Sequence, residues 1–171
     1  MDTWDAITSR RQVRSFTAEP LRDDLLRQIL EAGRRAPSGS NVQPWDFVVV
    51  ADSGQLERLS GVWKGAVWIS GATTAVALII PIQEEERARM LNRLDLGQTA
   101  MQMMIAATDL GVASGQAACA DQELAREVLG FPDDRQCALL IGLGFPADRP
   151  LAPIKKPARR PFEEVVHFGR W

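Results

Sequence analysis

The pattern of hydrophobic and polar positions predicts that helices and strands alternate along most of the chain. Asp23 to Ala36 is expected to form a helix, because leucine and isoleucine recur at helical spacing and two aspartates occupy the first turn. Pro37 ends this helix, and Ser38 to Asn41 must then form a loop. A shorter helix is expected at Asp2 to Ser9.

Short apolar runs that are rich in branched side chains predict the strands. The clearest runs are Trp45 to Ala51, Thr73 to Ile80 and Gln136 to Phe145. A weaker strand is expected at Gly115 to Cys119. Interleaving these strands with helices is typical of a mixed α and β fold, and the length suits a single domain over residues 1–171.

The remaining helices are expected at Gln55 to Leu59, at Asp121 to Leu129, and from Glu84 to about Leu110. Gly130 is expected at the C′ position that ends the second of these. The third is a long helix or a helix pair, and from Leu94 onward it is apolar nearly all round. Such a helix is enclosed by protein on every side. In a chain of 171 residues, a second subunit is the natural source of that cover.

Composition and charge narrow the possible partners. The chain carries 20 Lys and Arg against 22 Asp and Glu, for a net charge of −2. This balance gives no global electrostatic reason to bind nucleic acid or an anionic membrane. The first residues lack the features of a signal peptide, and the most apolar stretch, Ala72 to Pro81, is too short to span a bilayer as a helix. A cytoplasmic location is therefore expected.

The two cysteines, Cys119 and Cys137, lie in separate apolar stretches and form no CxxC pair. A disulfide framework is not expected, and with the single histidine, His167, they make a poor zinc set. We interpret both as small buried hydrophobic residues. The segment Gly142-Leu143-Gly144 is not a dinucleotide-binding fingerprint, because it lacks the third glycine and Pro146 follows where a helix should begin.

Two polar segments are candidates for ligand binding. The run Arg10-Arg11-Gln12-Val13-Arg14 offers guanidinium forks that suit phosphate oxygens, although a solvated surface turn is the alternative. The loop from Ala36 to Trp45 holds two prolines, Gly39 and several polar side chains that could meet a heterocycle edge or a sugar-like chain. Its alternative is a rigid connection whose side chains satisfy their own backbone.

Four ordered blocks resemble the nitroreductase family of FMN-dependent oxidoreductases. The first two are the RRxxRxF spacing from Arg10 to Phe16 and the later stretch APSGSNVQPWDFVVV. Asp95-Leu96-Gly97-Gln98 is similar to the family's entry into its central helix. The ending Leu143-Gly144-Phe145-Pro146, followed by Arg159 to His167, is similar to its C-terminal signature.

The resemblance implies an α+β three-layer sandwich: a central mixed or antiparallel sheet, helices on both faces and a C-terminal arm exchanged in a homodimer. FMN would bind at the dimer interface and pass electrons from NADH or NADPH to an electron-poor small molecule by a ping-pong mechanism, and no catalytic acid or base is assigned. The implied phosphate ligands are Arg10, Arg11 and Arg14, with Arg159 or Arg160 from the tail. The implied contacts to the isoalloxazine and ribityl chain are Pro37, Ser38, Gly39, Ser40, Asn41 and Gln43, with the backbone of Ser114 and Gly115.

The chain departs from the family pattern in two places. Gln12 or Val13 stands where the family often has serine, so one hydroxyl contact to phosphate is expected to be missing. The segment Ala51 to Arg93 is short, so Trp63, Trp68 or the stretch Gln83 to Arg89 is left to cover part of the flavin. The favoured interpretation of both tryptophans is packing in the core or at an interface. For His167 we expect a structural role in a tail that reaches across the dimer.

The sequence leaves other functions open. A different flavin reaction on the same scaffold, such as ene reduction, quinone reduction, reductive dehalogenation or flavin fragmentation, is one alternative. A flavin-binding or flavin-storage protein with little turnover is another. The third is a module that binds a phosphate-containing ligand other than a flavin.

Overall fold

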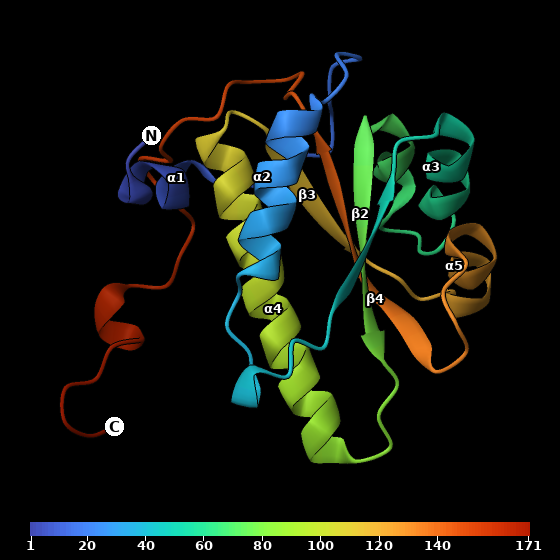
Figure 1. Cartoon of the computed structure of the whole chain (residues 1–171). Coiled ribbons are helices and arrows are strands. Elements are labelled where there is room, and N and C mark those ends of the chain that lie inside the picture. The colour runs from blue at the N-terminus through green and yellow to red at the C-terminus, as the bar shows by residue number, and fades with distance from the viewer.

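Four antiparallel strands form the central sheet of the computed structural model, which describes residues 1–171 (Figure 1). They are β1 (Asp46–Val50), β2 (Thr74–Pro81), β3 (Ala113–Ala118) and β4 (Arg135–Gly144), in the order β1-β2-β4-β3. All four predicted strands are present, and every pair is antiparallel. Strand β2 is buried almost from end to end, which explains its unbroken apolar sequence.

Helices cover both faces of this sheet. Helices α2 (Asp23–Arg34) and α4 (Glu86–Asp109) pack on one face, and α3 (Ser53–Ser60) and α5 (Gln122–Leu129) pack on the other (Figure 1). Each face has its own core of buried aliphatic side chains. The predicted three-layer α+β sandwich is therefore confirmed. The sequence did not predict the short 3-10 segment at Val67–Gly71.

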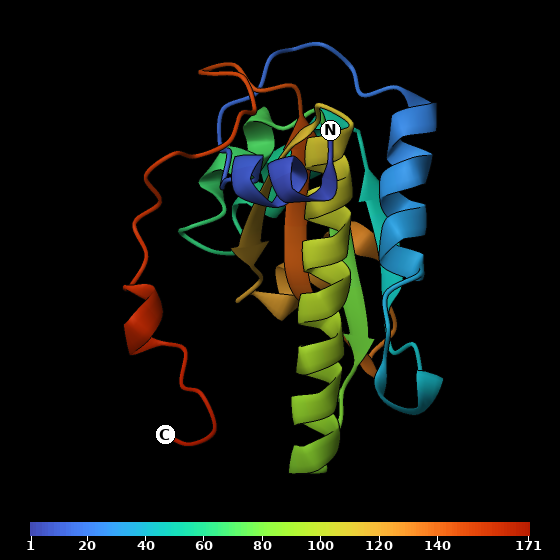
Figure 2. The same ribbon diagram turned by 90° about the vertical axis from the view of Figure 1, so that its left-hand side faces the viewer.

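The helix ends follow from simple capping chemistry. Asp2, Asp52 and Asp121 each accept a hydrogen bond from a backbone N–H of the first turn of the helix that follows. Gly130 adopts the left-handed conformation, with φ of 73°, after α5. The predicted end of that helix is thus confirmed. Helix α1 (Thr3–Ser9) lies across the C-terminal end of α4 (Figures 1 and 2).

Helix α4 is a single helix of 24 residues rather than a helix pair. From Leu94 onward its sequence is apolar nearly all round, but the chain covers only part of the apolar surface of the helix. Met90, Leu94 and Met101 are 63%, 60% and 41% exposed. Their spacing of four and seven residues places them along one side of the helix, with Gly97 between them. We call Met90, Leu94, Gly97 and Met101 the exposed α4 stripe.

The tail beyond β4 leaves the body of the molecule. Its first part is held by a bridge between Phe16 and Pro146 and by the N–H of Ile154, which donates to the carbonyl of Thr8. The rest extends away from the sheet, with one 3-10 turn at Phe162–Glu164 (Figures 1 and 2). Phe168 and Trp171 are almost fully exposed. None of the helices combines the length and the hydropathy needed to cross a bilayer.

Candidate functional site

The arginine run lies alongside β3, at the edge of the sheet. The backbone N–H of Val13 donates to the carbonyl of Ser114 at 3.0 Å, and the Gln12 side chain donates to the carbonyl of Gln116 at 2.5 Å. A Cβ atom at position 115 would lie 2.2 Å from the Val13 carbonyl oxygen. Gly115 therefore allows the run to approach the strand, because any side chain there would push it away.

Arg10 carries the most unusual environment among the predicted residues. Its guanidinium is half-buried, and its Nη2 contacts the Met104 sulfur at 3.3 Å, which is a weak acceptor. Its Nε is buried without any partner. Burial lowers the pKa of Arg10, and the nearby Arg159 guanidinium lowers this pKa further. Two cations that lie close enough to perturb one another, and that form no salt bridge in the chain, favour binding of an anion.

Two buried hydroxyl groups near this arginine also lack partners. They belong to Ser9, which precedes Arg10, and to Ser114, whose carbonyl binds the Val13 N–H. Buried polar groups are nearly always hydrogen-bonded in proteins, so unpaired ones call for a ligand or water. Ser9 was not predicted from the sequence, where a serine at a helix end is an ordinary feature. We call Ser9, Arg10, Gln12, Ser114, Gly115 and Arg159 the arginine cluster.

The other predicted arginines have different surroundings. The Arg11 guanidinium donates to the carbonyls of Arg149 and Pro150 and pairs with Asp148, so it holds the start of the tail. Arg14, the last residue of the run, is exposed. Arg160 pairs with Glu164 within the tail at 3.3 Å. Of the two tail arginines, Arg159 is thus the one whose charge lowers the pKa of Arg10.

The segment from Pro37 to Gln43, which we call the polar loop, has a strained backbone. Ser40, Asn41 and Gln43 have φ of 51°, 57° and 52°, values that non-glycine residues rarely adopt. Each such residue costs about 1–2 kcal/mol. Strain of this kind persists where the surroundings impose it, and it concentrates at ligand sites. The side chains of this loop are largely exposed.

A buried carboxylate on α4 fixes this loop. Asp95 is 4% exposed, and its Oδ2 accepts the backbone N–H of Gly39 at 3.1 Å. Ser38 adds a second anchor, because its Oγ accepts the backbone N–H of Gln43 at 2.9 Å. The positioning role of Asp95 was not predicted, although an acidic residue between Leu94 and Leu96 in an apolar helix is a visible signal.

The arginine cluster and the polar loop lie on opposite sides of α4. Arg10 contacts Met104, whereas the loop contacts Asp95. These two helix positions are nine residues apart, which is about 13 Å along the axis and about 180° around it. Figure 2 shows the same division, with α2 and the polar loop on one side of α4 and the tail on the other. One chain therefore does not bring the predicted cofactor residues together.

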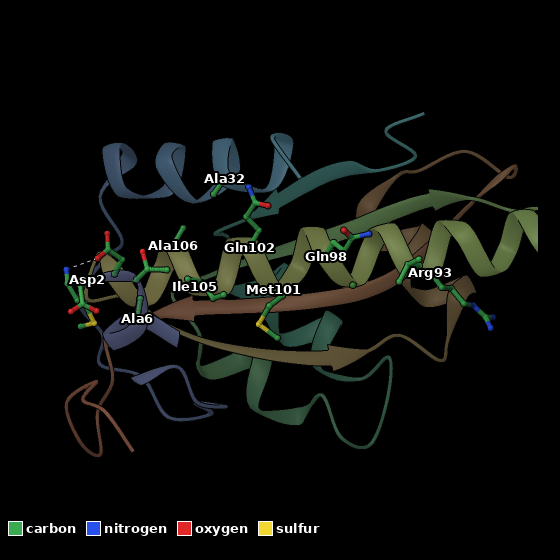
Figure 3. Close-up of a pocket in the computed structure, with 14 residues that line it drawn as sticks. Asp2, Ala6, Ala32, Arg93, Gln98, Met101, Gln102, Ile105 and Ala106 are labelled. Atoms are coloured by element: carbon green, nitrogen blue, oxygen red, sulfur yellow. Dashed lines mark hydrogen bonds and ion pairs between the residues drawn. The ribbon is translucent and has the colours of Figure 1, made fainter. Parts of the chain in front are cut away.

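A third feature is a groove of about 820 Å³ between α1, α2 and α4 (Figure 3). Helix α4 forms most of its lining, including Met101, Gln102, Ile105 and Ala106, and the N-terminal residues up to Ala6 and Ala32 of α2 contribute the rest. None of the predicted cofactor residues lines it. It continues the exposed α4 stripe, since Leu94, Gly97 and Met101 belong to both.

The nitroreductase family model matches residues 7–77 and 59–145, and the chain belongs to this family. The relatives include the FMN reductase (NAD(P)H) of Bacillus subtilis, which is 29% identical over 95% of this chain and 71% of its own length. They also include the NADH dehydrogenase of Thermus thermophilus, which is 25% identical over 94% of each chain.

Solved structures show the same fold. An FMN-dependent nitroreductase from Clostridium difficile R20291 superposes with a TM-score of 0.84 at 21% identity, over 97% of this chain and 98% of that one. The α+β architecture inferred from the four sequence blocks is thus shared along almost the whole chain.

Replacing Gly115 with alanine is expected to displace the arginine run from β3. The new methyl group would meet the Val13 carbonyl oxygen, and overpacking of this kind costs about 1–3 kcal/mol. We expect a lower free energy of unfolding in urea, together with weaker FMN retention after dialysis. Gly71→Ala is the matched control, because nothing lies within 4 Å of its added Cβ. Equal behaviour of the two variants would contradict the close approach.

Proposed function

We propose that this protein is an FMN-dependent oxidoreductase that takes electrons from NADH or NADPH and passes them to an electron-poor small molecule. The observation that carries the proposal is Arg10, a half-buried cation whose Nε has no partner and whose neighbour is a second cation. Membership in the nitroreductase family supports the same cofactor. The names of the Bacillus subtilis and Clostridium difficile proteins point to FMN and NAD(P)H as well.

The arginine cluster fits an FMN phosphate. That group carries about two negative charges near neutral pH and offers several acceptor oxygens. Arg10 and Arg159 would neutralise the charge, while the unpaired hydroxyls of Ser9 and Ser114 would donate to the oxygens. The exposed Arg14 would add a further positive charge to the phosphate site. Arg11 contributes indirectly, since it holds the tail that carries Arg159.

The polar loop fits the uncharged part of the cofactor. Pro37, Ser38, Gly39, Ser40, Asn41 and Gln43 present exposed amide and hydroxyl groups on a backbone that Asp95 and Ser38 hold in one conformation. Such donors suit the polar edge of the ring and the ribityl hydroxyls. When bound, FMN supplies the electron-transfer chemistry, and these residues bind and orient it.

The flavin site requires a homodimer, because the arginine cluster and the polar loop of one chain lie on opposite sides of α4. In a dimer packed through the exposed α4 stripe, the polar loop of one protomer would reach the arginine cluster of its partner. The stripe exposes three large apolar side chains, which a second copy would bury. Gly97 fits this arrangement, because a glycine inside a helix costs about 1 kcal/mol and no contact within the chain requires it.

The tail provides a second argument for the dimer. Phe162, Phe168 and Trp171 are 61%, 86% and 98% exposed. Large aromatic side chains are seldom left in water unless another surface covers them. We propose that this arm lies on the partner subunit. His167, whose ring lies against that of Trp171 with the centroids 4.3 Å apart, would have a packing role there.

The expected substrates are nitroaromatics, quinones or enones, and the expected mechanism is ping-pong. The purified protein should be yellow. In anaerobic stopped-flow measurements, NADH or NADPH should bleach the flavin absorbance, and the oxidised substrate should restore it in a separate phase. A yellow protein that neither nucleotide bleaches would instead be a flavin-storage protein. A colourless protein that takes up no added FMN would contradict the proposal altogether.

A further inference from the structure

The two cysteines, far apart in the sequence, lie next to each other in the fold. Cys119 directly follows β3, whose last pair with β4 is Ala118 and Leu139. Strand β4 contains a bulge at this level, because Leu78 of β2 pairs with Leu139 and Ile79 pairs with Cys137. Ala138 is therefore an extra residue, and the bulge brings Cys137 opposite the end of β3. The two thiols lie close enough together for each to shift the pKa of the other.

Both thiols point to the same side of the sheet. Cys137 belongs to the core between the sheet and helices α3 and α5, and Cys119 packs against that core. Regularly paired residues on antiparallel strands have Cα atoms about 4.5–5.5 Å apart, which falls within the range of about 4.4–6.8 Å that a disulfide requires. Cys119 lies one residue beyond the last regular pair of β3 with β4, on the same side of the sheet as Cys137, so the sheet geometry favours a link between them.

Gln122, at the start of α5, holds the two backbone segments at this spacing. Its Nε2 donates to the carbonyl of Cys119 at 3.0 Å and to that of Cys137 at 2.8 Å. Its Oε1 accepts the backbone N–H of Cys137 at 2.9 Å. One side chain thus bridges both cysteine residues through three hydrogen bonds. This clamp keeps the thiols together while α5 stays folded.

The two thiols differ in exposure and in acidity. Cys119 is partly exposed, whereas Cys137 is fully buried. Interaction with the Cys137 thiol lowers the pKa of Cys119, although burial opposes this change. The same interaction, together with burial, raises the pKa of Cys137. Thiol reactivity follows thiolate character and access, so Cys119 is the residue that an oxidant meets first.

We propose that Cys119 and Cys137 form a reversible oxidation site in which peroxide converts the two thiols into an intrachain disulfide. The Cys119 thiol loses its proton, and the thiolate attacks one oxygen of hydrogen peroxide. The O–O bond breaks, the departing hydroxide takes up that proton and leaves as water, and Cys119 becomes a sulfenic acid. The Cys137 sulfur then loses its proton and attacks the Cys119 sulfur. The S–O bond breaks and a second water leaves. The thiols give up two electrons, and the peroxide is reduced to two waters.

The site is separate from the arginine cluster. Ser114 and Gly115 lie near the start of β3, whereas Cys119 follows its other end. The disulfide would join β4 to the segment that leads into α5, so it would lock that end of the sheet without contacting the residues assigned to FMN. Oxidation of the two thiols therefore does not require bound FMN.

The test uses the full-length protein, treated with a small excess of hydrogen peroxide and then assayed for free thiols before and after addition of dithiothreitol. We expect the loss of both thiols, an intrachain Cys119–Cys137 link in peptide mass spectra, and full recovery on reduction. Two thiols that persist, a disulfide between two chains, or irreversible oxidation of Cys119 would each overturn the proposal.

Single variants assign the roles. In Cys137→Ala, peroxide should leave Cys119 as a sulfenic acid that dimedone traps, since no second thiol can resolve it. In Cys119→Ser, the buried Cys137 should stay reduced under the same conditions. Rapid oxidation of Cys137 in that variant would overturn the order of the steps. The wild-type measurement needs no variant, so it decides the proposal even where a substitution impairs folding.

Discussion

Replacing Arg10 with alanine is expected to raise the dissociation constant for FMN by about ten- to 150-fold. This range corresponds to about 1.5–3 kcal/mol, the usual value of a hydrogen bond to a charged group, at about 1.4 kcal/mol for each tenfold change. The effect should be large because the Arg10 guanidinium is half-buried and has no carboxylate partner in the chain. Fluorescence titration of the apoprotein with FMN measures it.

Arg11 offers a matched control one position away. Its guanidinium is committed to the carbonyls of Arg149 and Pro150, so Arg11→Ala should lower the free energy of unfolding more than it weakens FMN binding. Arg10→Lys should fall between wild type and Arg10→Ala, because it keeps the charge but loses the guanidinium fork. If Arg10→Ala binds FMN as tightly as wild type, or if Arg11→Ala loses more affinity, the phosphate lies elsewhere.

The sequence predicted the elements of the fold because their signals are local. Strand β2 is an unbroken apolar run that Pro81 ends, and α5 is framed by Asp121 and Gly130, each of which acts within one turn of the chain. The order β1-β2-β4-β3 is different, since it depends on which strands meet across long separations. The resemblance to a family supplied the three layers of the fold, and the strand order was not predicted.

The candidate site was predicted less completely, because sequence motifs identify a residue type but not its neighbours. Arg10 and Arg11 are equivalent in the motif, yet one is unpaired and the other is bound to tail carbonyls. Cys119 and Cys137 were interpreted separately as small hydrophobic residues. Cys137 is indeed buried, but a one-residue bulge in β4 brings the two thiols together. Such juxtapositions follow from register, which a sequence motif does not contain.

Replacing Met101 with arginine is expected to convert the proposed dimer into a monomer. Met101 lies in the exposed α4 stripe and also lines the groove beside it (Figure 3). A charge buried there without a partner costs about 3–5 kcal/mol, which weakens association by roughly two to four orders of magnitude. Multi-angle light scattering should report the change in mass. Dialysis should then remove FMN, because the polar loop and the arginine cluster of one chain do not converge.

Two further variants separate association from folding. Val67→Arg makes the same kind of change at a residue that is 63% exposed on the opposite face, and it should leave the dimer intact.

Gly97→Ala tests the exposed α4 stripe directly. If α4 faces solvent, the added methyl group meets nothing and raises helix stability by about 1 kcal/mol. If a second helix packs there, the same methyl group pushes the two apart, so the dimer dissociates at a higher protein concentration than the wild type does. A Met101→Arg protein that remains dimeric, together with a more stable Gly97→Ala protein, would place the interface on another surface.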